Sequence, residues 1–236
     1  MKELVRLENG SAVLGTAYME PTTAKDIEKK ASFVESNLST LGKMLYQYGM
    51  LEFKVKLAGE PTTNSLWVNG EVGNNSGPYK RGCFTEYDML ENFGNRSSYS
   101  SNIHYWWDKN RKGDEQHIDL ATAKLITKHR VDYYPAAGET DMTDDYHIFT
   151  LIWTDTGVKF AFDGISYCTY NSPSWYKEAM PNYIIVSSAI GAASYGPKYD
   201  VENDPEYQEA FVDYVRLYQI KDMGAFIYDV KNDRKY

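Results

Sequence analysis

The sequence predicts an all-β protein folded as a two-sheet antiparallel sandwich. About ten short segments rich in β-branched and aromatic residues follow one another with turn residues between them, and no long helical pattern interrupts the series. Aromatic residues, which favour strands, make up 15% of the 236 residues and include 21 Tyr. A chain of this length fits one all-β domain. We therefore expect a single domain over 1–220.

The strand assignments rest on alternation and on turn residues. Leu51, Phe53 and Val55 fall on one face of a strand, with charged residues between them. Asp163-Gly164 is the strongest hairpin signal in the chain. The expected strands are, in order, 13–17, 50–57, 65–68, 84–91, 102–107, 148–153, 158–162, 166–170, 183–189 and 211–218.

The charged end of the chain carries a weaker signal. We expect 221–236 to be a C-terminal tail or the start of a linker, although the pattern over 224–228 hints at another strand beginning there. The two cysteines, Cys83 and Cys168, permit at most one disulfide, and we expect both to be ordinary thiols.

Charge and hydropathy exclude several partners. The net charge is 25 − 33 = −8, which disfavours nucleic acid and anionic membranes, and a strongly sulfated substrate less firmly. No stretch approaches the ~18–20 apolar residues that a membrane-spanning helix needs. The N-terminus has no apolar core of a secretory signal, but a native signal could have been removed beforehand. We expect a soluble protein that acts as a monomer.

Three acids lie within one expected strand. Glu86 and Asp88 are two residues apart and therefore point to the same face, whereas Glu91 would point to the opposite one. A β-bulge around Met89-Leu90 would bring all three onto one face, and bulges are enriched beside active sites. Retaining hydrolysis of a glycosidic bond needs two carboxyl groups about 5–5.5 Å apart. A solvated acidic edge strand and a cation site are the competing interpretations.

The next expected strand adds two further candidates. Asn102, His104 and Trp106 share one face by the same alternation. If that face is the acidic one, His104 places an imidazole near the carboxylates and Trp106 offers an indole for stacking on a sugar. Taken alone, each is as readily a structural residue.

These residues carry a family resemblance. Glu86–Glu91 resembles the E-x-D-x-x-E signature of glycoside hydrolase family 16 in its bulged, laminarinase-like form. Further blocks of the family follow in the family's order over about 5–220: 48–57 (YGMLEFKVKL), 64–67 (NSLW), 146–153 (YHIFTLIW), 160–164 (FAFDG), 181–186 (PNYIIV) and 212–218 (VDYVRLY).

The resemblance implies a β-jelly-roll sandwich of the concanavalin A-like lectin/glucanase fold, with a glycan cleft on its concave face. It implies that Glu86 is the nucleophile, Asp88 the assisting acid and Glu91 the general acid/base. His104 matches a histidine beside the nucleophile, and substrate-binding positions match as well: Trp67 a tryptophan of the cleft and Asn37 a polar residue that contacts the sugar. No cofactor for catalysis is implied.

The resemblance also suggests a structural calcium site, and the sequence differs from the family's usual pattern in one segment. Many family members bind calcium on the convex side, and Asp213 and the Gly49 carbonyl match its usual ligands. Residues 59–67 lack the first tryptophan and the small-aromatic pair that the family usually carries before the catalytic strand. The sequence therefore does not predict the arrangement of sugar subsites. The insertion-like region 108–145 lies where the family's loops vary and determine specificity.

The expected function is retaining endo-hydrolysis of a polysaccharide, foremost β-1,3-glucan (laminarin) or mixed-linkage β-glucan. Agarose, porphyran, carrageenan or another β-galactan is the rival substrate, and Arg96, Lys109, Arg111 and Lys112 could serve a sulfated one. A non-catalytic lectin-like sandwich and a glucan transglycosylase are two competing hypotheses. A polymeric substrate implies secretion or display at the cell surface.

Overall fold

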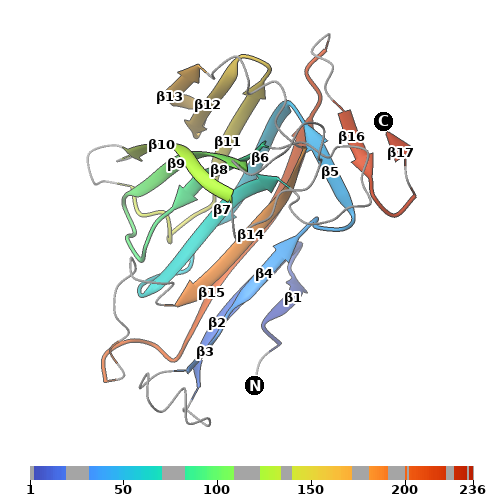
Figure 1. Ribbon diagram of the computed structural model, residues 1–236. Coiled ribbons are helices and arrows are strands. Elements are labelled where there is room, and N and C mark those ends of the chain that lie inside the picture. Colours follow the sequence, from blue (N-terminus) through green and yellow to red (C-terminus); the bar gives the residue numbers. More distant parts are fainter. Residues whose placement is uncertain are drawn as a thin grey trace.

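The computed structural model shows a β-sandwich (Figure 1). All regular elements among the described residues are strands, and every pairing between them is antiparallel. Within these residues there is no helix long and apolar enough to cross a membrane. The described residues are 3–19, 32–70, 83–108, 123–133, 140–171, 181–190, 200, 202–221, 226–232 and 234–235.

One sheet has eight strands and is the layer opposite the acidic strand. One of its strands, β3 (Ser32–Val34), pairs with β2 beside the main path. The main path runs β1 (Val5–Glu8), β2 (Ser11–Met19), β15 (Tyr207–Tyr218), β6 (Gly49–Lys56), β11 (His147–Thr154), β12 (Gly157–Phe162) and β13 (Ile165–Asn171).

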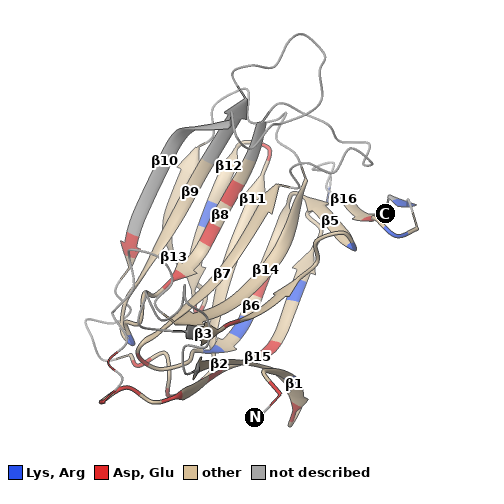
Figure 2. Ribbon diagram, turned by 60° about the horizontal axis from the view of Figure 1, so that its bottom comes forward, with Lys and Arg blue, Asp and Glu red and all other residues tan. Residues whose placement is uncertain are grey.

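The other sheet has nine strands and carries the acidic strand β8 (Cys83–Glu91). Strand β4 (Ser36–Ser39) pairs with β14 beside the main path. Figure 2 shows acidic positions in red along β8, in the middle of this sheet. The main path runs β10 (Ala123–Tyr133), β9 (Tyr99–Asp108), β8, β7 (Thr62–Gly70), β14 (Asn182–Ile190), β5 (Met44–Gln47), β16 (Phe226–Asp229) and β17 (Arg234–Lys235).

The core lies between the two sheets and is rich in aromatic rings. Trp153 of β11 is fully buried, and three tyrosines meet its indole edge-on: Tyr46, Tyr48 and Tyr87, at 5.3–5.5 Å between ring centroids. Edge-to-face contacts at this spacing are the favoured geometry of aromatic pairs. The aromatic-rich composition is thus accounted for largely by packing, which fixes the two sheets against each other.

The predicted all-β sandwich is confirmed, and each expected strand overlaps an observed one. The 221–236 segment differs from the expectation of a tail, because β16 pairs with β5 and Tyr228 is buried, so this segment extends the sheet. Strand β10 forms within the region expected to be an insertion-like loop. Strand β1 was not expected either, since Val5 and Leu7 are exposed on an edge strand and bury no apolar face.

Candidate active site

A β-bulge in β8 brings the three acids together on one face of the nine-stranded sheet. On β7, Leu66 pairs with Leu90 and Trp67 with Asp88, so Met89 is an extra residue. On the other side, three steps along β8 from Asp88 to Glu91 match only two steps along β9. The bulge predicted at Met89-Leu90 is therefore confirmed.

Burial shows what the bulge does to the side chains. Tyr87, Met89 and Leu90 are all buried in the core between the sheets, although two of them are consecutive. Because Met89 and Leu90 both point inward, the alternation restarts with Glu91 on the outward face. Glu86, Asp88 and Glu91 consequently share the face that points away from the core.

The first two acids and the predicted histidine form a compact group. His104 lies opposite Glu86 in the register of β8 and β9, and its Nε2 is 3.2 Å from Asp88 Oδ2. One ligand atom each of Glu86, Asp88 and His104 lies within 4.8 Å of the others. Asp88 is 4% exposed and His104 8%, so their interaction is largely shielded from water. The Nδ2 of Asn69 donates to Glu86 Oε2 at 3.5 Å from the β7 side.

The third acid is held by an amide from β9. Asn102 is buried, and its Nδ2 donates to Glu91 Oε2 at 2.5 Å. Ser100, which pairs with Glu91 in the register, donates instead to Asp132 of β10 at 2.7 Å. Asp88 and Glu91 thus have different surroundings: an imidazole beside Asp88 and a neutral amide on Glu91.

A buried amide network fixes the chain just beyond the third acid. Asn92 follows Glu91 directly, and its Oδ1 accepts a hydrogen bond from the backbone of Asn64 at 2.7 Å. The Asn64 side chain in turn bonds both the N–H and the C=O of Ala58, each at 3.1 Å. The end of β8 is therefore tied to the β6–β7 connection. This fixes the position of the backbone at Glu91.

The predicted sugar-binding residues Trp67 and Asn37 lie on the same face, two and four strands from β9. Trp67 pairs with Asp88, and its indole N–H donates to Ser187 Oγ of β14 at 3.2 Å. Asn37 of β4 pairs with Ser187 and is exposed. We name this surface, formed by the outward side chains of β9, β8, β7, β14 and β4, the cleft face.

The remaining predicted contact is Trp106. Its backbone lies in β9 and pairs with Phe84, but its side chain lies outside the part of the chain that the structure describes.

Three residues of the site were not singled out from the sequence as members: Asn69, Asn102 and Ser187. The strand pairing would have identified all three, because each lies opposite a predicted site residue on the neighbouring strand. Pairing between distant strands cannot be read from alternation alone.

The expected calcium ligands do not come together. Asp213 is an extra residue of β15 between Val212 and Tyr214, which pair with Val55 and Lys54, and its carboxylate pairs with Lys54 Nζ at 2.7 Å. Gly49 lies five residues away along β6, or about 16 Å at the rise of a strand. Asp213 and Gly49 therefore do not fit a shared calcium site.

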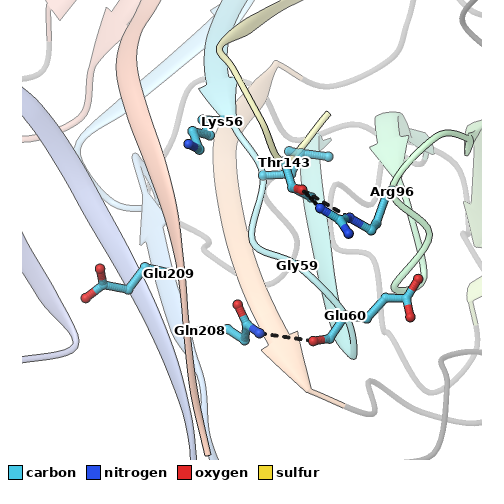
Figure 3. A pocket seen from close by; sticks show the side chains of 8 residues that line it. Lys56, Gly59, Glu60, Arg96, Thr143, Gln208 and Glu209 are labelled. Carbon is cyan, nitrogen blue, oxygen red and sulfur yellow. Dashed lines mark hydrogen bonds between the residues drawn. The ribbon is translucent and has the colours of Figure 1, made fainter. Parts of the chain in front are cut away.

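A polar pocket of about 440 Å³ lies away from the predicted site residues (Figure 3). Arg96 lines it and is engaged there, with Nη2 2.8 Å from Asp141 Oδ2 and 2.9 Å from the Thr143 hydroxyl. Burial acts to raise the pKa of Asp141, but hydrogen bonds from Thr143, together with the Arg96 guanidinium, hold this pKa below its usual value. Of the four cations considered for a sulfated substrate, Arg96 is thus committed elsewhere, and Lys109, Arg111 and Lys112 lie outside the described residues.

Two curated relatives match the chain in sequence. It is 25% identical over 208 residues to glucan endo-1,3-β-glucosidase A1 of Niallia circulans, which covers 83% of this chain and 28% of that protein. It is 24% identical over 190 residues to a keratan-sulfate endo-1,4-β-galactosidase of Sphingobacterium multivorum, which covers 78% of this chain and 39% of that protein. The chain thus spans only a part of each relative's length. No family model matches it.

Solved structures match over nearly the whole chain. The laminarinase catalytic domain of Thermotoga maritima MSB8 superposes with a TM-score of 0.69 at 21% identity, covering 94% of this chain and 82% of that one. A non-specific endo-β-1,3(4)-glucanase of glycoside hydrolase family 16 superposes with a TM-score of 0.67 at 23% identity, covering 92% and 78%. The resemblance stated from the sequence motifs is confirmed, and the fold is the jelly-roll sandwich of family 16 glucanases.

Proposed function

We propose that this chain is a retaining endo-β-glycanase that cleaves a neutral polysaccharide, foremost β-1,3-glucan or mixed-linkage β-glucan. The observation that carries the proposal is the bulge at Met89, which puts Glu86, Asp88 and Glu91 on one face beside His104. An acidic surface strand has no need of an extra residue that reverses its alternation. Retaining glycoside hydrolysis does need carboxyl groups that converge on one bond.

In the first step of the proposed reaction, Glu86 attacks the anomeric carbon. The bond from that carbon to the glycosidic oxygen breaks, and Glu91 gives its proton to the departing oxygen. The product is a glycosyl ester on Glu86, with Glu91 left ionised. In the second step Glu91 removes a proton from water, the water oxygen attacks the same carbon, and the ester bond to Glu86 breaks. Two inversions give overall retention, and neither step uses a cofactor.

The two neighbours of the nucleophile have distinct proposed roles. Asp88 lies between Glu86 and Glu91 in the strand, and His104 Nε2 contacts its carboxylate. A charged or proton-sharing carboxyl beside two others separates their proton affinities, which lets one acid stay protonated while another is ionised. We therefore assign Asp88 as the assisting acid and His104 as the group that holds it.

The charge of the cleft face supports a neutral substrate. Its described carboxylates are Glu86, Asp88 and Glu91, and its described side chains include no Lys or Arg. A polyanion would be repelled by such a surface. The relative from Niallia circulans is a glucan endo-1,3-β-glucosidase, and one of the solved neighbours was co-crystallised with 1,3-β-D-cellotriosyl-glucose. An extracellular polymer as substrate would require secretion or surface display.

A charged β-galactan is the second candidate substrate. In the register of β9 and β10, Asn102 pairs with Arg130 and His104 with Lys128, so the backbones of two cationic residues lie two strands away from the acidic strand β8. One relative is a keratan-sulfate endo-1,4-β-galactosidase. Arg and Lys on this part of the sheet would suit a substrate that carries sulfate groups.

The test is the release of reducing ends from laminarin, mixed-linkage glucan, agarose, carrageenan and keratan sulfate. Wild type, Glu86→Gln and the exposed control Glu202→Gln are compared at matched concentration. We expect activity on a glucan, loss by several orders of magnitude in Glu86→Gln, and no change in Glu202→Gln. Product analysis separates hydrolysis from transglycosylation.

The remaining outcomes are equally informative. Cleavage confined to a galactan would keep the catalytic assignment and overturn the glucan. A folded protein that binds glycan equally well as wild type and as Glu86→Gln, and cleaves none of the five polymers, would contradict the enzyme and favour a lectin-like sandwich.

A further inference from the structure

The carbonyl of Met89 is a buried hydrogen-bond acceptor at the bulge of β8. Met89 has no partner in the register with β7, and on the β9 side the single residue Ser101 faces both Met89 and Leu90. A buried carbonyl without a hydrogen bond destabilises the fold, because it has lost the water that it would bind in the unfolded chain. A bulge that is to persist in the core therefore needs a donor from outside the ladder.

Two side chains supply that donor. Ser101, fully buried, donates from Oγ to the Met89 carbonyl at 2.7 Å. The hydroxyl of Tyr167 lies 2.8 Å from Ser101 Oγ and 3.4 Å from the same carbonyl. Since the serine proton is used on Met89, Tyr167 is the donor to serine. The chain of donation therefore runs from Tyr167 to Ser101 to Met89, and successive hydrogen bonds of this kind strengthen one another.

Tyr167 reaches the bulge from the opposite sheet, and a second bulge puts it there. In β13, Cys168 pairs with Phe160 while Ser166 pairs with Ala161, so Tyr167 is an extra residue of its strand. Both Tyr167 and Cys168 consequently pack on the core, as Met89 and Leu90 do across from them. The two bulges, one in each sheet, are thus linked by the hydroxyl of Tyr167, which contacts Ser101 and the Met89 carbonyl.

The ring of Tyr167 is fixed and its hydroxyl stays protonated. It stacks on Tyr133 at 4.0 Å between centroids and meets Tyr99 edge-on at 6.0 Å. Burial raises the pKa of Tyr167, so the hydroxyl remains a donor across the working pH range of a glycosidase.

We propose that Ser101 and Tyr167 are positioning residues, a clamp that sets the orientation of Glu91 by holding the bulge next to it. The inference rests on the proposed function, in which Glu91 is the acid/base. Neither residue touches substrate. Their effect reaches the reaction only through the backbone between Asp88 and Glu91, where a displacement of about 1 Å can cost about a hundredfold in rate.

The test compares Ser101→Ala and Tyr167→Phe with matched controls. Ser188→Ala and Tyr46→Phe each remove a buried hydroxyl that has no hydrogen-bond partner among the described residues. Tyr167→Phe deletes one oxygen and preserves the ring contacts, so it keeps the test open if Ser101→Ala folds poorly. All four variants are assayed on the polysaccharide that wild type cleaves and on a dinitrophenyl β-glycoside of the same sugar.

We expect kcat on the polysaccharide to fall about 10–100-fold in Ser101→Ala and about 3–10-fold in Tyr167→Phe, with KM within about twofold of wild type. The loss should be smaller for formation of the glycosyl-enzyme from the dinitrophenyl glycoside, because that leaving group departs without a proton from Glu91. The controls should match wild type. Equal kcat in clamp and control variants, or a loss in KM alone, would overturn the clamp.

Hydrogen exchange tests the clamp independently of activity. We expect the amides of residues 89–92 to exchange faster in Tyr167→Phe than in Tyr46→Phe, because the bulge opens more readily without its donor. Unchanged exchange there would contradict the clamp even if the chain cleaved no glycan, whereas absent cleavage with faster exchange would count against the proposed function only.

Discussion

Strands β6 and β8 lie in opposite sheets and differ in how their side chains alternate between the two faces of the sheet. In β6, buried and partly exposed residues alternate without interruption from Gly49 to Lys56. In β8 the direction of the side chains alternates through Asp88 and then breaks, since Met89 and Leu90 both point into the core. The regular strand builds only the core. The bulged strand builds the core and also gathers three acids, which regular alternation could not do with this spacing.

The largest expected difference between the two strands is in activity. Glu91→Gln on β8 should lower kcat on the polysaccharide about 10²–10⁴-fold, because the amide can neither give nor take the proton. Glu52→Gln, at an outward position of β6, should stay within about twofold of wild type. Initial-rate kinetics on both purified variants checks this, with circular dichroism to show that both are folded. Comparable losses in the two would remove the distinction between the strands.

The inward positions of the two strands should differ in another way. Met89→Ala and Leu51→Ala each empty a buried site, and we expect each to lower the free energy of unfolding by about 2–5 kcal/mol. Only Met89→Ala should also lower kcat, since it loosens the bulge next to Glu91. Urea titration and kinetics below the unfolding transition separate the two effects. A fall in kcat of similar size in Leu51→Ala would contradict this prediction.

A smaller change is expected at the amide on Glu91. Asn102 donates to Oε2, which favours the ionised carboxylate over the protonated one. Asn102→Ala removes this preference, so Glu91 should keep its proton to higher pH. The basic limb of the kcat/KM profile should then move upward, with a loss in rate of several fold at the optimum. A limb that moves downward or stays in place would show that the amide does not act on the proton of Glu91.

The smallest effect belongs to the outward face of β6. The hydrogen bond from Lys54 to Asp213 raises the pKa of Lys54. The pair therefore adds stability that is complete below the unfolded pKa of lysine and is lost as the pH rises through the folded value. Because both groups are solvated, Asp213→Asn should change Tm only slightly at neutral pH and not at all at strongly alkaline pH. Thermal melts at both pH values check this, and a growing difference at alkaline pH would contradict the sign.

The same contrast explains how far the sequence could be read. The alternation in β6 predicted that strand directly, and the Asp163-Gly164 turn predicted its hairpin. The spacing of the three carboxylates in β8 predicted a bulge, which the structure confirms. The bulge at Tyr167 in β13 gave no such signal, because β13 carries no set of candidate site residues that would need to share one face. Strand β10 was missed for a related reason, because its polar, irregular pattern predicts no strand by itself and it pairs with β9. The hint of a strand over 224–228 is confirmed by β16, which pairs with β5.

Site residues divide along the same line. Glu86, Asp88, Glu91 and His104 were predicted from spacing within single strands, and the structure places them together. Asn102 and Ser101 depend on the register between strands, and Tyr167 on the packing of one sheet against the other. The pairing of Gly49 with Asp213 failed because matching two segments separately does not fix their relative register.

The central claim is that the bulge aligns Glu86 as a nucleophile with Glu91 as its acid/base. Its most direct test is to treat the protein with an activated 2-deoxy-2-fluoro β-glycoside of the sugar that it cleaves, digest it, and map the labelled peptide by mass spectrometry. The account predicts one sugar per chain, attached to Glu86, and no label in Glu86→Gln. A label on another residue, or none in a protein that turns over its polysaccharide, would contradict it.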